Sequence, residues 1–498
     1  MNMGVLLRTA RYLKPIQVWA RVWNKMPRRH PKSDPLPTRG VRPQSSFPRY
    51  YSCWDGGASF TFLHETHDIR TSADWNSPNR QKLWLYNLHY FDCLRGSDNP
   101  PADAVAGLLE RWLAENPVGR GNGWEPYPIS LRIVNWIKWL LSTDGMAVAA
   151  DLRGRLERSL CVQTRSLRAR LEYHLLANHL LANAKSLVFA GTFFDGSEAE
   201  GWLRKGLAIY KKQLPEQILA DGVHFERSAM YHAIILEDLL DCFNLTGNAL
   251  FVPWIRRMCA GLELLTGPDG RIVKFNDASE GIALAPAELQ AYAERLGVGG
   301  AAEVSALPLQ ESSGHDSGIV RMEVGEYVAL AKTGEIGSSY QPGHAHADTW
   351  TFELWKSGVK VVSDTGCSTY ELGAVRSYER GTRAHNTVVV DGQNSSEVWA
   401  SHRVGHRFDW CRHRREFKLT EEGLQGIDHI FVKGRHDIEI RFHLPPGVSK
   451  EDVVIECPGT LSWETCDFAE GWNVRKPGLC AVYSFEVTAP TKIEWSIR

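Results

Sequence analysis

Histidine and aspartate alternate along one short stretch of the chain. His344, His346 and Asp348 lie two residues apart from one another and precede a strand-like run at 349–355. Residues two apart in an extended segment share a face, so these three side chains are expected to project together. Two imidazoles and one carboxylate suit a divalent metal ion, a proton-transfer site, or both.

Two further polar residues interrupt apolar, strand-like patterns downstream. Asp364 follows the run Val-Lys-Val-Val-Ser at 359–363, and His385 opens the run His-Asn-Thr-Val-Val-Val. A polar side chain in a buried strand is costly unless it is paired. A single histidine would be interpreted as a satisfied core residue or an exposed one, but this cluster indicates a functional site.

The order of these motifs resembles the heparinase II/III family of polysaccharide lyases. The resemblance rests on His-Ala-His-Ala-Asp at 344–348, Ser-Asp-Thr-Gly-Cys-Ser-Thr-Tyr at 363–370 and Arg-Ala-His-Asn-Thr-Val-Val-Val-Asp-Gly at 383–392. It extends over most of the chain, from about Tyr86 to about Glu397. It implies a helical toroid followed by a β-sandwich, and an enzyme that acts by β-elimination.

The composition indicates a globular protein with large cores. The chain has 498 residues, of which 43% are hydrophobic, enough for two or three domains. Its formal net charge of −1 argues against a nucleic-acid-binding protein. The ten cysteines form no CxxC pair, which favours reduced thiols in the cytosol. The N-terminus lacks the apolar core of a signal peptide, and no run approaches the ~18 apolar residues of a membrane span. We therefore expect a cytoplasmic protein without a transmembrane segment, with export by another route left open.

The hydrophobic pattern changes twice along the chain. Residues 1–48 are expected to form an amphipathic basic helix and a Pro/Arg-rich tether, residues 49–300 a helical domain, and residues 310–498 an antiparallel β-sandwich. The fold class is therefore multidomain α+β, and the resemblance specifies the helical part as an incomplete α/α toroid. A cleft between two such domains is a common place for a ligand site. The basic first helix could contact a membrane surface or a partner, or simply pack on its own domain.

A five-residue sequence, His-Leu-Leu-Ala-Asn, occurs twice in a row at 174–183. On a helix, His174 and Asn178 would share one face, and His179 and Asn183 would form a neighbouring row. Buried Asn and His are costly unless paired, so a structural network that joins helices is one interpretation. The resemblance implies that Asn178 holds the substrate carboxylate with His179 beside it. Asn183 is expected to cap or bridge helices.

Two tyrosines could transfer protons. Arg227 precedes Tyr231 by one helical turn, where its charge could favour a tyrosinate by lowering a pKa that starts near ~10. A buried tyrosine with a hydrogen-bonded hydroxyl is the structural alternative. The resemblance implies that Tyr231 is catalytic, and it matches Tyr378 to a second tyrosine that some relatives use as general acid.

Further residues are expected to line a sugar-binding cleft. Arg380 and Arg383 lie in a locally basic loop suited to sulfate or carboxylate groups, although a solvated loop would have the same composition. Two upstream aromatic segments occur at matching places in the resemblance, and plain packing is their alternative. The expected substrate-binding residues are Asn87, His89, Tyr90, Trp124, Tyr127, Arg227, Arg380 and Arg383.

The resemblance also implies one divalent ion, held by His346, Asp364 and His385. Two imidazoles and one carboxylate suit Zn²⁺, with Mn²⁺ as the alternative, and no organic cofactor is expected. The ion would brace the β domain and orient His344. A competing ligand set of His344, His346 and Asp348 is compact in sequence, but it would consume the residue wanted for catalysis.

The activity that the resemblance implies is β-elimination at a 4-linked uronic acid, in a glycosaminoglycan or an alginate-like polymer. Removal of the C5 proton builds charge beside a carboxylate, which Asn178, helped by His179 or His344, would neutralise. Tyr231, or His344 for some stereochemistries, would accept the proton, and a tyrosine would protonate the leaving oxygen. The expected catalytic residues are Asn178, His179, Tyr231, His344 and Tyr378.

Two other functions stay open from the sequence alone. A non-catalytic glycan-binding or assembly protein of surface-polysaccharide biosynthesis would fit the missing export signal. A hydrolase would need two carboxylates across the scissile bond, whereas the motif-dense segments offer Asn, His and Tyr. The expected partner is an acidic polysaccharide and not a nucleic acid; the sequence specifies neither the polymer nor the oligomeric state.

Overall fold

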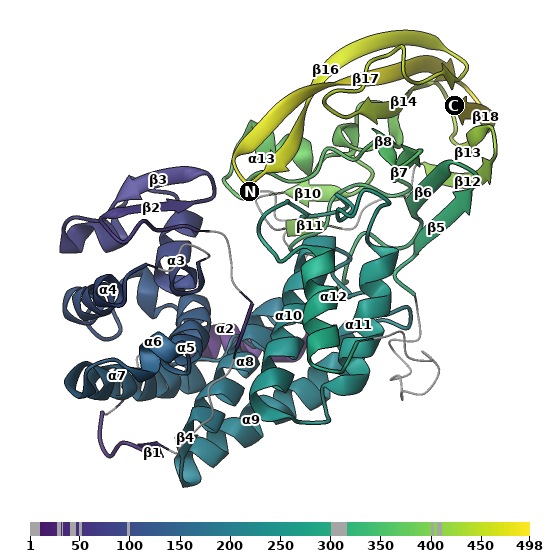
Figure 1. Cartoon of the computed structure of the whole chain (residues 1–498). Helices are drawn as coiled ribbons and strands as arrows, with labels where there is room; N and C mark the ends of the chain where they lie inside the picture. Colours follow the sequence, from purple (N-terminus) through teal and green to yellow (C-terminus); the bar gives the residue numbers. More distant parts are fainter. Residues whose placement is uncertain are drawn as a thin grey trace.

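The structure of the protein is a computed structural model, and helices dominate its first part and strands its second (Figure 1). It describes residues 10–26, 31, 33–39, 46–48, 52–96, 100–299, 316–399, 403–405 and 411–498. The predicted domain boundary at 300–310 lies outside these residues, as do residues 1–9 of the predicted first helix and 27–30 of the tether. Among the described residues, none of the helices combines the length and apolarity that crossing a bilayer requires.

The helical part is built around α8 (Ala177–Phe193). Its neighbours α5 (Pro126–Leu140), α9 (Ser197–Gln217) and α10 (Ala229–Thr246) pack around it. Only His179 and Thr192 of α8 are not fully buried, as expected for a helix that is apolar on every side. The other helices are α2 (Pro15–Asn24), α3 (Lys82–Tyr90), α4 (Ala102–Glu115), α6 (Thr143–Met146), α7 (Ala150–Ala169), α11 (Val252–Leu264) and α12 (Pro286–Arg295).

The C-terminal part contains a two-stranded sheet of β10 (Glu397–Trp399) and β11 (Arg403–Gly405). It also contains three four-stranded antiparallel sheets, with strand orders β5-β6-β7-β8, β16-β17-β14-β9 and β12-β13-β18-β15. Their inward side chains, among them Phe352, Phe442 and Trp495, share one apolar core. Alternating burial along β13 and β18 is typical of strands with one face on such a core. The strands are β5 (Ile319–Val324), β6 (Tyr327–Lys332), β7 (Phe352–Lys356), β8 (Val359–Val362), β9 (Val388–Val390), β12 (Arg412–Thr420), β13 (Gly423–Phe431), β14 (His436–Leu444), β15 (Ile455–Glu456), β16 (Thr460–Gly471), β17 (Val474–Val487) and β18 (Thr491–Ile497).

The turn between β16 and β17 reaches back to the start of the helical part. It contacts the hairpin of β2 (Ser59–Phe62) and β3 (Glu65–Asp68), as Figure 1 shows at the upper left. His64 Nδ1 lies 2.8 Å from the carbonyl oxygen of Trp472, and Asn473 Nδ2 donates to the carbonyl of Leu63 over 3.1 Å. These contacts hold the two parts together on one side of the cavity described below.

The predicted multidomain α+β fold is confirmed, but one local prediction is wrong. His174 does not share a helix face with Asn178, because α7 ends at Ala169 and α8 begins only at Ala177. The left-handed backbone of Leu176 (φ 63°) and Ala177 (φ 48°) turns the chain between the two helices. Asn183 does bridge elements as expected: its side chain contacts Glu172 and Ser130 at 2.8 to 3.0 Å.

Glycine sets the close contact between α8 and α9. A Cβ on Gly191 would lie 2.4 Å from the backbone nitrogen of Leu203, so Gly191→Ala must push the helices apart. We expect this change to lower the free energy of unfolding by about 1–3 kcal/mol, measured by urea denaturation. Gly154→Ala in α7 is the matched control, because a Cβ there meets no atom within 4 Å. The control should be stabilising by about 0.5–1 kcal/mol, and equal effects of the two changes would contradict the packing account.

Candidate active site

Asp277 lies at the centre of the polar cluster that the sequence motifs form. Its Oδ2 is 2.9 Å from His344 Nδ1, and its Oδ1 is 2.8 Å from His346 Nε2. Arg376 Nη2 donates to Oδ2 over 2.9 Å. Burial alone would raise the pKa of Asp277, but the charge of Arg376 and the hydrogen bonds from the imidazoles hold it well below its usual value. The carboxylate is therefore ionised, and it fixes the orientation of both imidazole rings.

The two histidines thus converge as predicted, but not on Asp348. Both carboxylate oxygens of Asp348 accept hydrogen bonds from the buried Lys332 Nζ, at 2.6 and 2.7 Å. The competing ligand set of His344, His346 and Asp348 is therefore wrong as a cluster. Asp277 was not predicted from the sequence, in which its only local signal is a pair of consecutive polar residues, Asn276 and Asp277, after an apolar run.

The other side of the His344 ring faces Asn178 and Glu226. His344 Nε2 is 3.4 Å from Asn178 Nδ2 and 3.5 Å from Glu226 Oε2. Asn178 also donates to Glu226 Oε1 from its side chain, over 3.0 Å, and from its backbone nitrogen. Since Asn178 lies in the first turn of α8, backbone N–H groups and the positive end of the helix dipole point the same way. The arrangement suits the binding of a carboxylate.

Two tyrosines separate this cluster from the cavity. The Tyr231 ring lies on His344 with centroids 3.9 Å apart, and its hydroxyl is 2.9 Å from that of Tyr370. The Tyr370 hydroxyl in turn lies 3.3 Å from His344 Nδ1. Burial raises the pKa of Tyr231 well above its usual value, and the nearby Tyr127 adds to this. Tyr231 is therefore a neutral phenol at pH 7.

The expected effect of Arg227 on Tyr231 is wrong. The Arg227 guanidinium points away from the phenol: its Nε donates to the carbonyl of Ser317 over 2.8 Å, and its Nη1 lies 3.7 Å from Glu335. Its backbone has a positive φ of 54°, which turns the chain just before α10 begins. Arg227 therefore has a structural role, and the prediction that it binds substrate is wrong for the free protein.

Tyr378 is also placed away from the cluster. It packs against Cys466, Phe468 and Cys480 of the β-sandwich, and its buried hydroxyl has no hydrogen-bond partner among the described residues. Burial raises its pKa, with Cys466 contributing. The tyrosine that contacts Tyr231 is instead Tyr370, at the end of the 363–370 motif.

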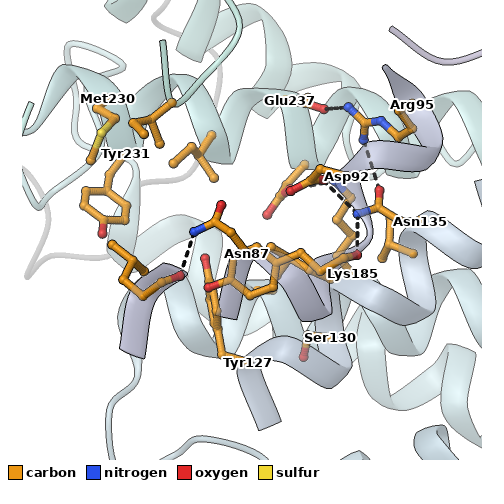
Figure 2. Close-up of a pocket in the computed structure, with 18 of the residues that line it drawn as sticks. Asn87, Asp92, Arg95, Tyr127, Ser130, Asn135, Lys185, Met230, Tyr231 and Glu237 are labelled. Atoms are coloured by element: carbon orange, nitrogen blue, oxygen red, sulfur yellow. Dashed lines mark hydrogen bonds and ion pairs between the residues drawn. The ribbon is translucent and has the colours of Figure 1, made fainter. Parts of the chain in front are cut away.

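A cavity lies next to Tyr231, among helices of the N-terminal part (Figure 2). Asn87, Tyr90 and Tyr127 line it from the helices, and Tyr370 and Trp472 of the sheet-rich part close another side of it. Three of the eight expected substrate-binding residues therefore reach the cavity. His179 sits behind its wall, with its ring 4.5 Å from that of Tyr127 and its Nδ1 3.1 Å from Glu172. Burial opposes protonation of His179, but the Glu172 charge outweighs it and raises the pKa.

A buried charged network forms the end of the cavity away from Tyr231 (Figure 2). Asp238 and Lys185 form an ion pair of 2.6 Å, and Arg95 pairs with Glu237 at 3.1 Å. Burial raises the pKa of Asp238, and Lys185 opposes this shift. Every carboxylate named here already has a cationic partner, which is not the arrangement of two free carboxylates that hydrolysis of a glycoside uses.

The other five expected substrate-binding residues, with Arg227 among them, lie elsewhere. His89 is fully buried between Trp75 and Trp112, and burial lowers its pKa to about 3. Trp124 is 3% exposed and donates to the carbonyl of Asn116. These two residues are core packing, the alternative that the sequence left open.

The arginines of the basic loop are not both solvated. Arg380 is 1% exposed and donates to the carbonyl of Ala345 over 3.0 and 3.2 Å, so it holds the loop between His344 and His346. Arg383 is partly exposed near Glu439 and Glu464, at 3.6 and 3.7 Å. Neither lines the cavity, so the prediction of a cleft-lining basic loop is wrong for the free protein.

The predicted metal ligands lie directly behind Asp277. His385 Nδ1 is 2.8 Å from Asp364 Oδ2, and the His346 and His385 rings are 5.4 Å apart. His346 Nδ1 and His385 Nε2 are both buried and have no hydrogen-bond partner among the described residues. Two unsatisfied imidazole nitrogens beside a carboxylate are a donor set that fits a divalent ion. As placed here the three side chains do not form a group that could hold a metal ion, and neither does any other set of three His, Cys, Asp or Glu side chains in the described chain.

The fold and the site together define a class of protein. In this class a helical toroid is joined to a β-sandwich, and Asn, Tyr and His side chains meet where the two domains face each other. The family model described as "Heparinase II/III N-terminus" matches residues 104–283, and that described as "Heparinase II/III-like, C-terminal" matches residues 307–411. Together they cover more than half of the chain, which belongs to the heparinase II/III family.

The curated relatives are heparin-sulfate lyases. That of Bacteroides thetaiotaomicron is 25% identical over 337 residues, covering 57% of this chain and 48% of the relative. That of Bacteroides stercoris is 23% identical over 362 residues, which cover 62% of this chain and 53% of the relative. The chain thus spans about half the length of these relatives.

Solved structures share the fold. A crystal structure of heparinase III has a TM-score of 0.64 at 16% identity, covering all of this chain and 91% of the other. The structure of a heparinase III gene product has a TM-score of 0.59 at 18% identity, and the match covers 86% of this chain and 81% of the other. At these identities the likeness establishes the toroid and β-sandwich architecture.

The Asp277 cluster makes a testable contribution to stability. Asp277→Asn leaves the buried Arg376 without its counter-charge, which should cost about 3–5 kcal/mol in urea denaturation at pH 7. Because the pKa of Asp277 is lowered on folding, this stabilisation is present above about pH 4 and is lost as the pH falls through the folded-state value. The variant and the natural protein should therefore converge in stability at low pH.

Glu494→Gln is the control for Asp277→Asn, since the Lys492–Glu494 pair is exposed on β18. It should leave the unfolding midpoint unchanged. A loss for Asp277→Asn no larger than that of the control would show that the cluster does not depend on the carboxylate.

Proposed function

We propose that the protein is a polysaccharide lyase that cleaves a uronic-acid-containing glycosaminoglycan by β-elimination. The observation that carries the proposal is the convergence of Asn178, Tyr231 and His344 beside the cavity, in a chain of this family. The names of the curated relatives support the same class of activity and substrate. An alginate-like polymer and a non-catalytic role in glycan assembly have no supporting observation in the structure.

Asn178 is proposed to hold the uronate carboxylate. Neutralising that charge matters because C5, the carbon that loses its proton, carries the carboxylate. The base must then lie close to Asn178, and His344 Nε2 is 3.4 Å from the Asn178 amide nitrogen. Since Asp277 accepts the hydrogen bond at Nδ1, Nε2 is the nitrogen left to take the proton.

Tyr231 is proposed to be the general acid. Because its pKa is raised, Tyr231 does not ionise at neutral pH and cannot act as a tyrosinate base. Its hydroxyl keeps a proton that it can donate. In the reaction the C5–H bond breaks, its proton goes to His344, and the electron pair is delocalised into the carboxylate as an enolate. The pair then forms the C4=C5 double bond as the C4–O bond breaks, and the leaving oxygen takes the proton of the Tyr231 hydroxyl.

Substrate entry requires a small rearrangement. Asn178 is 3% exposed and His344 7%, and the Tyr231 ring lies on the ring of His344. The 2.9 Å contact between the Tyr231 and Tyr370 hydroxyls must therefore open when the uronate enters. Catalytic hydrogen bonds of free enzymes often reach their final geometry only with substrate bound.

The proposal predicts different effects for two buried tyrosines. Tyr231→Phe removes the proposed acid and should reduce kcat by at least about 10²-fold with little change in melting temperature. Tyr378→Phe is the matched control and should retain the activity, because its hydroxyl has no partner in the described structure. The assay is the near-ultraviolet absorbance of the unsaturated uronide, on a panel of heparan-, chondroitin- and hyaluronan-type polymers and alginate.

The outcomes separate the functions. If Tyr231→Phe produces the unsaturated uronide as fast as the natural protein, Tyr231 is not the general acid. New reducing ends without absorbance would indicate a hydrolase, and binding without cleavage would indicate an assembly or binding protein.

We further propose that His346, Asp364 and His385 bind one divalent ion, with Zn²⁺ ahead of Mn²⁺. When bound, the ion would supply a positive charge at the two unpaired imidazole nitrogens and brace the strands behind Asp277. Asp364 contacts the opposite nitrogen of His385, Nδ1, in the free protein and would have to turn toward the ion to become its third ligand. Since His346 is hydrogen-bonded to the same Asp277 as His344, a fixed His346 ring helps to keep the His344 ring in place.

The metal proposal is tested by elemental analysis of two variants. His385→Ala should lose the ion and lower the melting temperature, since it removes a ligand behind the cavity. His344→Ala should keep the ion and lose the activity, because His344 bonds to Asp277 and not to the ion. Retention of the metal by His385→Ala and its loss from His344→Ala would contradict the assignment.

A further inference from the structure

Helix α2 presents an exposed apolar face. Trp19 and Trp23 lie one turn apart, and their rings stack with centroids 5.2 Å apart. Six of the fifteen exposed large hydrophobic residues in the described chain fall within eleven consecutive positions. They are 39 to 61% exposed: Ile16, Val18, Trp19, Val22, Trp23 and Met26. A contiguous patch of this kind marks an interaction surface.

The sequence segment that contains this face is strongly basic. Eight lysine and arginine residues and no aspartate or glutamate precede Asp34 in the sequence. Since the whole chain has a formal net charge of −1, the residues after position 33 together carry −9. Exposed Arg11 and Lys25 flank the two ends of the apolar face. A binding partner that matches both the apolar face and the basic residues would have an apolar interior and an anionic surface.

The opposite face of α2 is anchored to the protein. Gln17, which is fully buried, donates to the carbonyls of Leu175 and Tyr340, each over 3.4 Å. Lys14 pairs with Glu216 and lies 3.9 Å from the centre of the Tyr340 ring. The helix is therefore not a loose tail, and its exposed face has a fixed orientation relative to the site.

We propose that α2 is a docking helix for membrane surfaces that contain anionic lipids. Tryptophan is enriched at the membrane–water interface because its ring is amphipathic, and basic side chains add attraction to anionic headgroups. A helix that lies in the interface buries one apolar face to a depth of a few ångströms, which matches a single exposed face on a helix of ten residues. A protein partner would not require the basic flanks. The proposal is independent of the proposed lyase activity.

Docking would place the membrane next to loops that carry site residues. Leu175 directly precedes Leu176 and Ala177, whose strained backbone leads into Asn178. Tyr340 lies four residues before His344. Gln17 thus connects the docking helix to both loops.

The test is flotation of the full chain with lipid vesicles, which needs no substrate. The protein should float with phosphatidylcholine vesicles that contain phosphatidylglycerol, bind weakly to phosphatidylcholine alone, and be released by high salt. The double substitution Trp19→Ser and Trp23→Ser should weaken binding by about tenfold or more. The matched control, Leu461→Ser with Trp463→Ser, changes two exposed apolar residues of β16 and should bind like the natural protein.

Each other outcome overturns the proposal. Failure of the natural protein to float with anionic vesicles refutes it directly, and so does equal flotation of the two double variants. Self-association that Trp19→Ser and Trp23→Ser abolish, without vesicle binding, would assign the face to a second copy of the chain. Melting temperatures of both variants, measured in parallel, confirm that exposed positions were changed without loss of the fold.

Discussion

The shared carboxylate of Asp277 is the constraint on which the rest of the site depends. It is buried, it accepts hydrogen bonds from both His344 and His346, and it neutralises the equally buried Arg376. A buried charge with fewer partners would be too costly to keep. One side chain from the helical segment thus connects the His344 loop, the Arg376 helix and the cavity wall. The domain interface and the candidate active site are therefore a single structure.

Backbone strain gathers around the same place. Leu176, Ala177, Arg227 and Asn276 all have positive φ angles without being glycine, and each directly precedes or adjoins a site residue. The side chain of Asn276 stabilises this strained backbone by donating hydrogen bonds to the carbonyls of Glu226, Arg227 and Ile336. Strained residues persist where the surrounding contacts over-determine them, and here those contacts hold Asn178 and Asp277 in position.

The sequence predicted what local patterns encode. Helical and strand periodicities gave the two-domain architecture, and the two-residue spacing of His344 and His346 predicted their convergence. It could not predict the acceptor, because Asp277 lies 67 residues from His344 and no local pattern connects them. Tyr378 and Tyr370 stand in adjacent motifs, and only the tertiary fold shows which one meets Tyr231. The break between α7 and α8 was also hidden, since no glycine or proline marks it.

The central claim is that Asp277 holds His344 with Nδ1 protonated and with Nε2 bare toward Asn178. The most direct measurement is the ¹⁵N chemical shift of both His344 ring nitrogens at neutral pH, assigned by the signals missing in His344→Gln. The account predicts a neutral ring with its proton on Nδ1, ready to accept a proton at Nε2. A ring protonated at Nε2 in the resting protein would contradict it, because His344 could not then take the C5 proton.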